Sequence, residues 1–361
     1  MSCKILINNP GIFGPGDAIS GQIICIFERE ERIRGIQCQF RGREEVHWNE
    51  RRGKHTTRFH GQNDFVVANT NFAEEGTMRP GKYEYNFSYV LPPAFIPSSY
   101  QHQFGSIRYF LHAFVDRPFA FDYKDDVALH VVSPIVNSPT THQMRPISLE
   151  VNKEVGSCCW PKEPSTMELQ LEKDSYVVGD VINFKALINN TSDSEISSVM
   201  VQLSTTIQLT AYSPSTRHKT DRVLLAVAEG SGVAQGSRKI HKFSLKIPET
   251  AIITNFNKCT LFTQWCSLRV QALYPLFHSN MVAEITIKLG NTVYMTDQMQ
   301  LAINNPSNSF VPVAQAPPVV YPPVLPPSAP LANDRFTVIG DNNGTTEGPP
   351  PSYDDVVKDS Y

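Results

Sequence analysis

Large apolar side chains alternate with polar ones along most of this chain, and this pattern constrains the fold more than any other feature. One stretch places five side chains on one face, namely Tyr83, Tyr85, Phe87, Tyr89 and Leu91. Another does the same with Ile107, Tyr109, Leu111, Ala113 and Val115. Successive side chains of a strand point to opposite faces, so the pattern predicts antiparallel sheets with one buried face. Long helical periodicity is missing, and Val223–Glu229 reads at most as a short helical piece. We therefore predict an all-β protein built of sandwiches.

A weak internal repeat divides the alternating region in two. The segment 15–19 (Pro-Gly-Asp-Ala-Ile) opens one strand, and the segment 178–182 (Val-Gly-Asp-Val-Ile) opens another 163 residues later. The same offset places Ile36, Cys38 and Phe40 on Val199, Val201 and Leu203. Leu91-Pro92 likewise precedes a strand pair much as Ile247-Pro248 does. One offset held through strand, turn and strand predicts a duplicated domain.

Composition sets the expected boundaries. We predict sandwiches over residues 1–135 and 166–303, joined by a linker over 136–165 that is rich in Pro, Ser, Thr and Lys. The composition then changes, because residues 306–361 hold 12 of the 27 prolines and six acidic side chains against two basic ones. A segment of this kind buries too little apolar surface to order itself. We expect residues 304–361 to form a disordered tail.

The bulk properties exclude several classes of protein. A formal net charge of −3 gives no global reason to expect nucleic-acid binding. No apolar run approaches the length of a membrane span, and the first residues lack the apolar core of a signal peptide. Seven cysteines without paired spacing suit a reducing compartment better than a disulfide framework. We expect a cytoplasmic protein.

The tail carries a Pro-Pro-x-Tyr element at Pro350, Pro351 and Tyr353, the peptide that WW domains bind. Polyproline II has three residues per turn, so Pro350 and Tyr353 lie on one face. An aromatic-lined groove takes such a face with little chain entropy left to lose. The alternative is a chance match in a proline-rich segment.

A second, incomplete element lies upstream. Pro318 precedes Tyr321 by three residues, as the motif requires, but Val319 replaces the second proline. We interpret it as a weak WW site. Bivalent capture of a partner needs two working peptides within reach of each other.

The combination of motifs resembles the α-arrestin (arrestin domain-containing) family. Segments 13–21, 33–36 and 41–42 are similar to the opening of the arrestin N-terminal domain, and 91–100, 105–109 and 116–118 to its later signature. Segments 173–180 and 189–192 look like the arrestin C-terminal domain. The resemblance implies two tandem arrestin-like β-sandwiches and an adaptor, recruited to plasma membrane and endosomes. It also implies partners: WW domains of HECT-type E3 ubiquitin ligases, and cytoplasmic tails of membrane receptors or transporters.

A basic stretch in the first half is a candidate cargo or phosphate patch. It has a net charge of +3 over residues 41–60, and its cations are Arg41, Arg43, Arg51, Arg52, Lys54 and Arg58. Clustered Arg side chains can pair bidentately with phosphates or carboxylates. The alternative is a solvated hairpin, with Val46 and Trp48 marking its strand.

The cysteines offer two further hypotheses. Cys158 and Cys159 stand beside Trp160, where palmitoylation could hold the protein at a membrane, against the simpler interpretation of two unmodified thiols. Neither they nor Cys259 and Cys266 complete a zinc spacing, so we expect no metal. Cys25 and Cys38 read as core residues.

No catalytic motif occurs, and we expect neither enzymatic activity nor a cofactor. Two alternatives to the ligase adaptor stay open. One is an arrestin-fold trafficking scaffold that acts without ubiquitin. The other is a redox-linked regulator that traps thioredoxin through a cysteine such as Cys259, although no low-pKa environment for that thiol is visible in the sequence.

Overall fold

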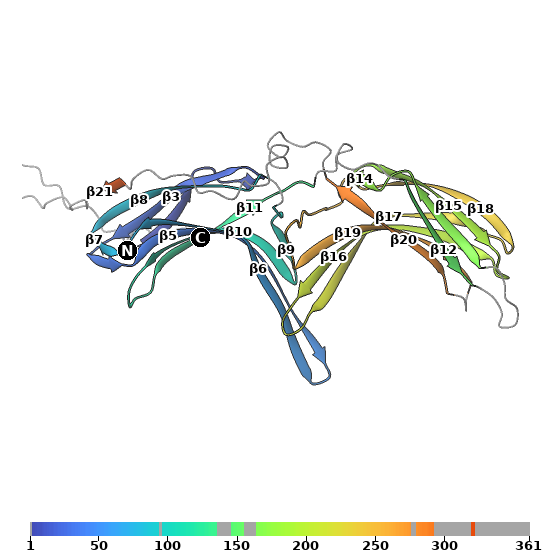
Figure 1. Ribbon diagram of the computed structural model, residues 1–361, viewed down its shortest axis with the longest axis horizontal. Coiled ribbons are helices and arrows are strands. Elements are labelled where there is room, and N and C mark those ends of the chain that lie inside the picture. The colour runs from blue at the N-terminus through green and yellow to red at the C-terminus, as the bar shows by residue number, and fades with distance from the viewer. Residues whose placement is uncertain are drawn as a thin grey trace, which may run out of the picture. The chain divides into compact units, whose positions relative to one another are not determined.

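The computed structural model describes residues 2–93, 96–135, 146–154, 164–275 and 279–291, together with the backbone of residues 319–321. Every regular secondary-structure element in these ranges is a β-strand, which confirms the all-β prediction (Figure 1). The short helical piece expected at Val223–Glu229 is wrong. These residues lie in strand β17 (Arg217–Val233), whose long pairing with a neighbouring strand overrides their local preference.

The first half of the protein, residues 2–135, contains two main sheets. One sheet has the order β1 (Ser2–Ile7), β3 (Ala18–Phe27), β8 (Gly81–Val90) and β21 (Val319–Tyr321). The other has the order β2 (Ile12–Phe13), β11 (Tyr123–Val131), β10 (Gly105–Asp116), β5 (Gly35–Arg52) and β6 (His55–Ala73), with β9 (Tyr100–His102) also paired to β10. A small ribbon joins β4 (Glu31–Ile33) to β7 (Gly76–Met78).

The second half, residues 146–291, repeats this plan. One sheet has the order β12 (Ile147–Lys153), β13 (Ser165–Leu171), β15 (Val181–Asn190) and β18 (Ser237–Lys246). The other has the order β14 (Ser175–Val177), β20 (Met281–Gly290), β19 (Phe262–Leu273), β16 (Ile196–Ala211) and β17. Strand β12 lies inside the stretch assigned to the linker, and its alternating Ile147, Leu149 and Val151 are half-buried.

The two halves share details that only a common frame explains. Strand β2 pairs in parallel with β11, and β14 pairs in parallel with β20, while the other pairs in these two sheets are antiparallel. Gly16 and Gly179 adopt left-handed conformations, with φ of 85° and 89°. The carbonyl of Asp17 accepts the Leu91 N–H at 2.9 Å, and that of Asp180 accepts the Ile247 N–H at 2.8 Å. The repeat seen in the sequence is therefore a repeat of structure.

The inward faces of the alternating strands build two cores. In the first half the largest fully buried side chains include Phe40, Tyr89 and Tyr109, and the Phe40 ring stacks on both tyrosine rings. Burying one such side chain contributes about 1.5–3 kcal/mol. This core continues into the second half, because it also includes Leu209, Ala211, Leu261 and Phe262. The two halves thus share apolar packing within one compact unit.

Candidate functional site

The longest hairpin of the molecule, β5–β6, carries the basic stretch and separates its cations into two groups. Arg41 and Arg43 are half-buried near the start of β5, whereas Arg51, Arg52, Lys54 and Arg58 are exposed toward the hairpin tip. At about 3.3 Å per residue, Arg43 and Arg51 stand roughly 26 Å apart along the strand. The six residues are therefore spread along the hairpin, and two of them, Arg41 and Arg43, line a hollow.

That hollow, with a volume of about 430 Å³, lies on the outer face of the first-half sheet that contains β5, β10 and β11. Its polar lining is mainly cationic and its apolar lining aromatic, comprising Gln39, Arg41, Arg43, Phe110, His112, Phe114, Asp122 and Lys124. The Arg43 guanidinium lies 5.7 Å from the Phe110 ring centroid. Arginine can stack on an aromatic ring and at the same time donate from its edge to a carboxylate. The surface suits an acidic or phosphorylated peptide.

Asp64 on β6 holds the two arginines in place. Its carboxylate accepts Arg43 Nε at 2.5 Å and Arg43 Nη2 at 3.1 Å, and Arg41 Nη1 lies 3.5 Å away. The hydrogen bonds from Arg43 lower the pKa of Asp64, so it stays charged. Arg41 Nε is buried and has no hydrogen-bond partner among the described residues. Because this atom is buried, the hollow would attract an anion by the positive charge of its lining rather than through Arg41 Nε.

Glu44 connects the two halves, and it is the most completely buried charged side chain of the described chain, with no exposed surface. Its Oε1 accepts the Thr260 N–H at 2.8 Å, the Thr260 hydroxyl at 2.9 Å and the Asn63 amide at 2.9 Å. Its Oε2 accepts the Leu261 N–H at 2.9 Å. A buried carboxylate is tolerated only with such partners. Glu44 thus fixes the segment before β19 against strand β5.

Further contacts join the β5–β6 hairpin to the second half. Trp48 and Phe59 stack across the β5–β6 hairpin with ring centroids 6.0 Å apart. Lys219 of β17 lies 3.8 Å from the Phe104 centroid and 5.8 Å from that of Trp48. The N–H of His60 donates to Ser213 O at 2.9 Å. The half of the β5–β6 hairpin nearer its tip is therefore anchored to the second half.

Sequence analysis missed the role of Glu44, although a signal was present. It was counted among the charges of the basic stretch, yet it occupies an inward position between Gly42 and Val46 in the alternation of β5. An acidic residue at an inward position predicts a buried contact. Its partners lie 216 and 217 residues further along the chain, so their identity could not be predicted.

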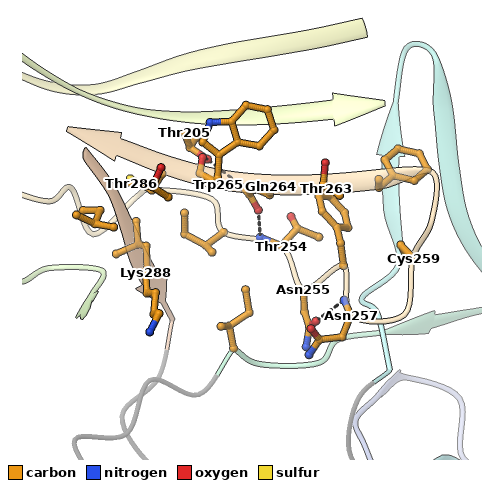
Figure 2. A pocket seen from close by; sticks show the side chains of 17 residues that line it. Thr205, Thr254, Asn255, Asn257, Cys259, Thr263, Gln264, Trp265, Thr286 and Lys288 are labelled. Atoms are coloured by element: carbon orange, nitrogen blue, oxygen red, sulfur yellow. Dashed lines mark hydrogen bonds between the residues drawn. The ribbon is translucent and has the colours of Figure 1, made fainter. Parts of the chain in front are cut away.

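The segment before β19 also lines a pocket of about 420 Å³ (Figure 2). Within it, Gln264 Oε1 accepts the Thr254 N–H at 2.9 Å, and Asn255 Oδ1 accepts the Asn257 N–H at 2.9 Å. Cys259 stands at the same pocket. Burial raises the pKa of its thiol well above the ordinary value, and the negative charge of Glu44 raises it further. A thiol held in this way is a poor nucleophile.

The remaining cysteines take structural positions. Cys25 and Cys38 are fully buried, which confirms their expected place in the core, and Cys3 and Cys266 are buried too. Cys158 and Cys159 lie outside the described residues. No cluster of three or more potential metal ligands occurs in the described ranges. Within the same ranges, no helix has the length and apolar character needed to cross a bilayer.

The two tail motifs differ in how much of each the structure describes. Pro350, Pro351 and Tyr353 lie outside the described residues, as does Pro318. Tyr321, by contrast, belongs to β21, whose backbone pairs with β8. The structure therefore leaves the complete motif untested and gives the incomplete one a backbone partner.

Comparison with known proteins matches both halves. The family model "Arrestin (or S-antigen), N-terminal domain" matches residues 3–137, and "Arrestin (or S-antigen), C-terminal domain" matches residues 161–294. Arrestin domain-containing protein 17 of Caenorhabditis elegans is 26% identical over 294 residues, covering 74% of this chain and 66% of that protein. Human arrestin domain-containing protein 4 is 26% identical over 252 residues, covering 66% and 59%. The chain thus spans less than two thirds of the length of either relative. Human thioredoxin-interacting protein is 22% identical over 384 aligned positions, covering 98% and 95%.

Proposed function

The chain belongs to the α-arrestin, or arrestin domain-containing, family, and on this premise we propose that it is a cytoplasmic trafficking adaptor for ubiquitin ligases. Its tail peptide at Pro350, Pro351 and Tyr353 binds the WW domains of HECT-type ligases. Its sandwiches bind the cytoplasmic tails of membrane receptors or transporters. The complex forms at the plasma membrane and on endosomes, and it promotes ubiquitination, endocytosis and sorting of the cargo.

The complete Pro-Pro-x-Tyr element beyond two arrestin domains is the observation that carries this proposal. The proline face of the peptide fills the aromatic groove of a WW domain, and the tyrosine ring fills the adjacent pocket. Asp354 and Asp355 follow the tyrosine directly and add negative charge beside the groove. A chance match in a proline-rich segment has no reason to accompany the domains of an adaptor.

The Arg41–Arg43 hollow is the favoured cargo surface of the adaptor. Two arginines, Lys124 and two phenylalanines line it, against one acidic side chain, Asp122. We expect it to take an acidic or phosphorylated segment of a cargo tail. The exposed cations at the hairpin tip add only screened, long-range attraction to the same partner.

The ligase half of the proposal is tested with the full-length protein and isolated WW domains. Changing Tyr353 to Ala removes the side chain that fills the tyrosine pocket, so we expect the affinity measured by calorimetry to fall by about a hundredfold or more. Changing Tyr361 to Ala is the matched control, and it should leave the affinity unchanged. Undiminished binding after the Tyr353 change would refute the proposal.

Deleting residues 306–361 separates this function from a scaffold that acts without ubiquitin. An adaptor loses cargo ubiquitination and sorting together, whereas a scaffold keeps sorting. The likeness to thioredoxin-interacting protein favours a third candidate, capture of thioredoxin through Cys259. The raised pKa of that thiol disfavours the thiolate which such a step needs. A mixed disulfide that disappears on changing Cys259 to Ser would support this candidate over the ligase adaptor.

A further inference from the structure

A short strand from the proline-rich region lies on the edge of the first sheet. Strand β21 pairs antiparallel with β8, in the register Val319 opposite Glu84, Val320 opposite Tyr83 and Tyr321 opposite Lys82. Without β21, β8 would be the last strand of this sheet. The strand therefore closes part of an edge that would otherwise expose unpaired backbone groups.

The sequence explains why the strand has these bounds. Val, Val and Tyr are among the residues most enriched in strands. Pro318 and Pro322 flank them, and proline has no N–H to donate to a ladder. Val319 keeps an N–H at the position where a complete WW motif has its second proline. The departure that weakens this motif is thus the same one that makes a three-residue strand available.

Strand pairing and WW binding make incompatible demands on these residues. A WW groove reads polyproline II, with three residues per turn and a backbone free of internal hydrogen bonds. A strand has a period of two and commits one edge of its backbone to its neighbour. While Tyr321 is paired opposite Lys82, it cannot lie on a polyproline face.

We propose that the edge of β8 is an intramolecular docking site for residues 319–321, and that docking withholds Tyr321 from WW domains. The docking stands on the backbone pairing alone, whereas the withholding rests on the WW-domain function proposed above. The adaptor then offers one WW peptide while β21 is docked and two after its release.

The edge favours its own tethered strand over a foreign one. Lys82 and Glu84 form an ion pair at the docking register, with 2.5 Å between Nζ and Oε1. Charged side chains on an edge discourage pairing between molecules. Three paired residues are too few to hold a free peptide, but a tether supplies an effective concentration in the millimolar range. Docking in cis is therefore the expected use of this edge.

Disulfide trapping tests the docking. In protein with Cys158 and Cys159 changed to Ser, the pair Glu84→Cys with Val319→Cys places two thiols directly opposite each other, within reach of a disulfide. The pair Lys82→Cys with Tyr321→Cys is a second in-register test. The control, Lys82→Cys with Val319→Cys, is two residues out of register. We expect peptide mapping to show in-register disulfides forming about tenfold faster than the control. Equal rates, or no disulfide in either in-register pair, would overturn the docking.

Hydrogen exchange gives an independent measurement with a matched control. Deleting residues 306–361 removes β21, whereas deleting residues 324–361 removes the complete WW motif and leaves β21 in place. We expect amides of residues 82–84 to exchange faster only in the first variant, with the β3 amides unchanged in both. Unchanged protection of residues 82–84 in the first variant would contradict the docking, whatever the fate of the WW motif.

The proposal that docking withholds Tyr321 is tested by measuring how tightly WW domains bind the incomplete motif when it is free and when it is docked. A peptide spanning residues 314–326 is compared with the protein lacking residues 324–361, which carries the same incomplete motif. We expect the peptide to bind WW domains at least several-fold more tightly than the protein. If the peptide and the protein bind WW domains with equal affinity, or if neither binds, the proposal that docking withholds Tyr321 is wrong. The result is separate from the Tyr353 experiment, because neither molecule contains that residue.

Discussion

The two halves of the protein share one frame, yet the first half contains larger side chains at equivalent points. With the repeat offset of 163, Gly42 and Thr205 are equivalent, and they lie opposite Tyr109 and Cys266 respectively. A Cβ on Gly42 would meet Phe65 at 2.5 Å and Tyr109 at 3.0 Å. The missing side chain of Gly42 therefore makes room for two aromatic rings. The second half fills the corresponding space with Thr205 and Cys266. The two halves therefore share the strand arrangement but differ in the side chains that pack inside it.

A second difference concerns how each half contacts the other. Glu44 is equivalent to Ile207 by the same offset, and only the first half places a charge at this inward position. Its hydrogen bonds run to backbone groups of the second half. The two halves are thus connected at a position where their shared frame carries different residues, Glu44 and Ile207.

The largest expected effect comes from Tyr109, whose ring is fully buried and whose hydroxyl donates to Pro97 O at 2.7 Å. Changing Tyr109 to Ala removes the ring and leaves a cavity, so we expect the free energy of unfolding to fall by about 3–5 kcal/mol. Changing its counterpart Cys266 to Ala removes one sulfur atom and should cost below about 2 kcal/mol. Urea unfolding of both variants measures the difference. Similar losses would show that the two cores are equivalent after all.

Removing the carboxylate of Glu44 is expected to have the next largest effect. Glu44→Ala leaves the buried N–H groups of Thr260 and Leu261 without their acceptor, at about 1–3 kcal/mol for each group. We expect lower stability and faster hydrogen exchange at these two amides. The control is Glu45→Ala, next in sequence. It loses a partly exposed ion pair with Arg108 and a 3.3 Å hydrogen bond from Ser106 Oγ, and it should change stability by about 1 kcal/mol. Equal effects of the two changes would refute a connecting role for Glu44.

The smallest effect concerns pH and His241, the counterpart of Tyr85 in the first half. His241 lies opposite Ala186, and Tyr85 lies opposite Ile23, which is 163 residues before Ala186. His241 is only 7% exposed, and its ring stacks on Phe243 at 5.9 Å. Burial lowers the pKa of His241, and the nearby charge of Lys239 lowers it further. The unfolded chain therefore binds a proton more readily, so this contribution to stability is complete above about pH 6.5 and is lost as the pH falls through the folded value.

Replacing His241 by Phe keeps the stacked ring and removes the titration. We expect the variant to lose less stability than the parent protein between about pH 6.5 and pH 5 in urea unfolding. Tyr85→Phe in the first half is the control, because a tyrosine does not titrate in this range. A parent protein and His241 variant with identical pH profiles would contradict the assignment.

The features that sequence analysis predicted well are local or periodic. The alternation at Tyr85, Phe87 and Tyr89 marks buried faces, and the shared turn at Asp17 and Asp180 marks the duplication. Both are written within a few residues, where the geometry of strands and turns decides the outcome.

The features that it could not predict depend on distant partners. The residues near Glu44 in sequence do not indicate that its partner is Thr260. The proline-rich composition around Val319–Tyr321 likewise does not predict a strand, and it does not predict pairing with Lys82–Glu84. The cations of the basic stretch are spread along the hairpin for a geometric reason. Residues that are close in sequence lie far apart on an extended strand, so Arg41 and Arg43 line a hollow that Arg51 does not reach.

The apolar packing across the two halves has a consequence for each half taken alone. Leu209, Ala211, Leu261 and Phe262 complete the core of the first half although they belong to the second. Either half expressed as a separate fragment would present part of that core to water, with a tendency to aggregate. We therefore expect that neither sandwich folds stably alone and that the two can be moved into another protein only as a pair.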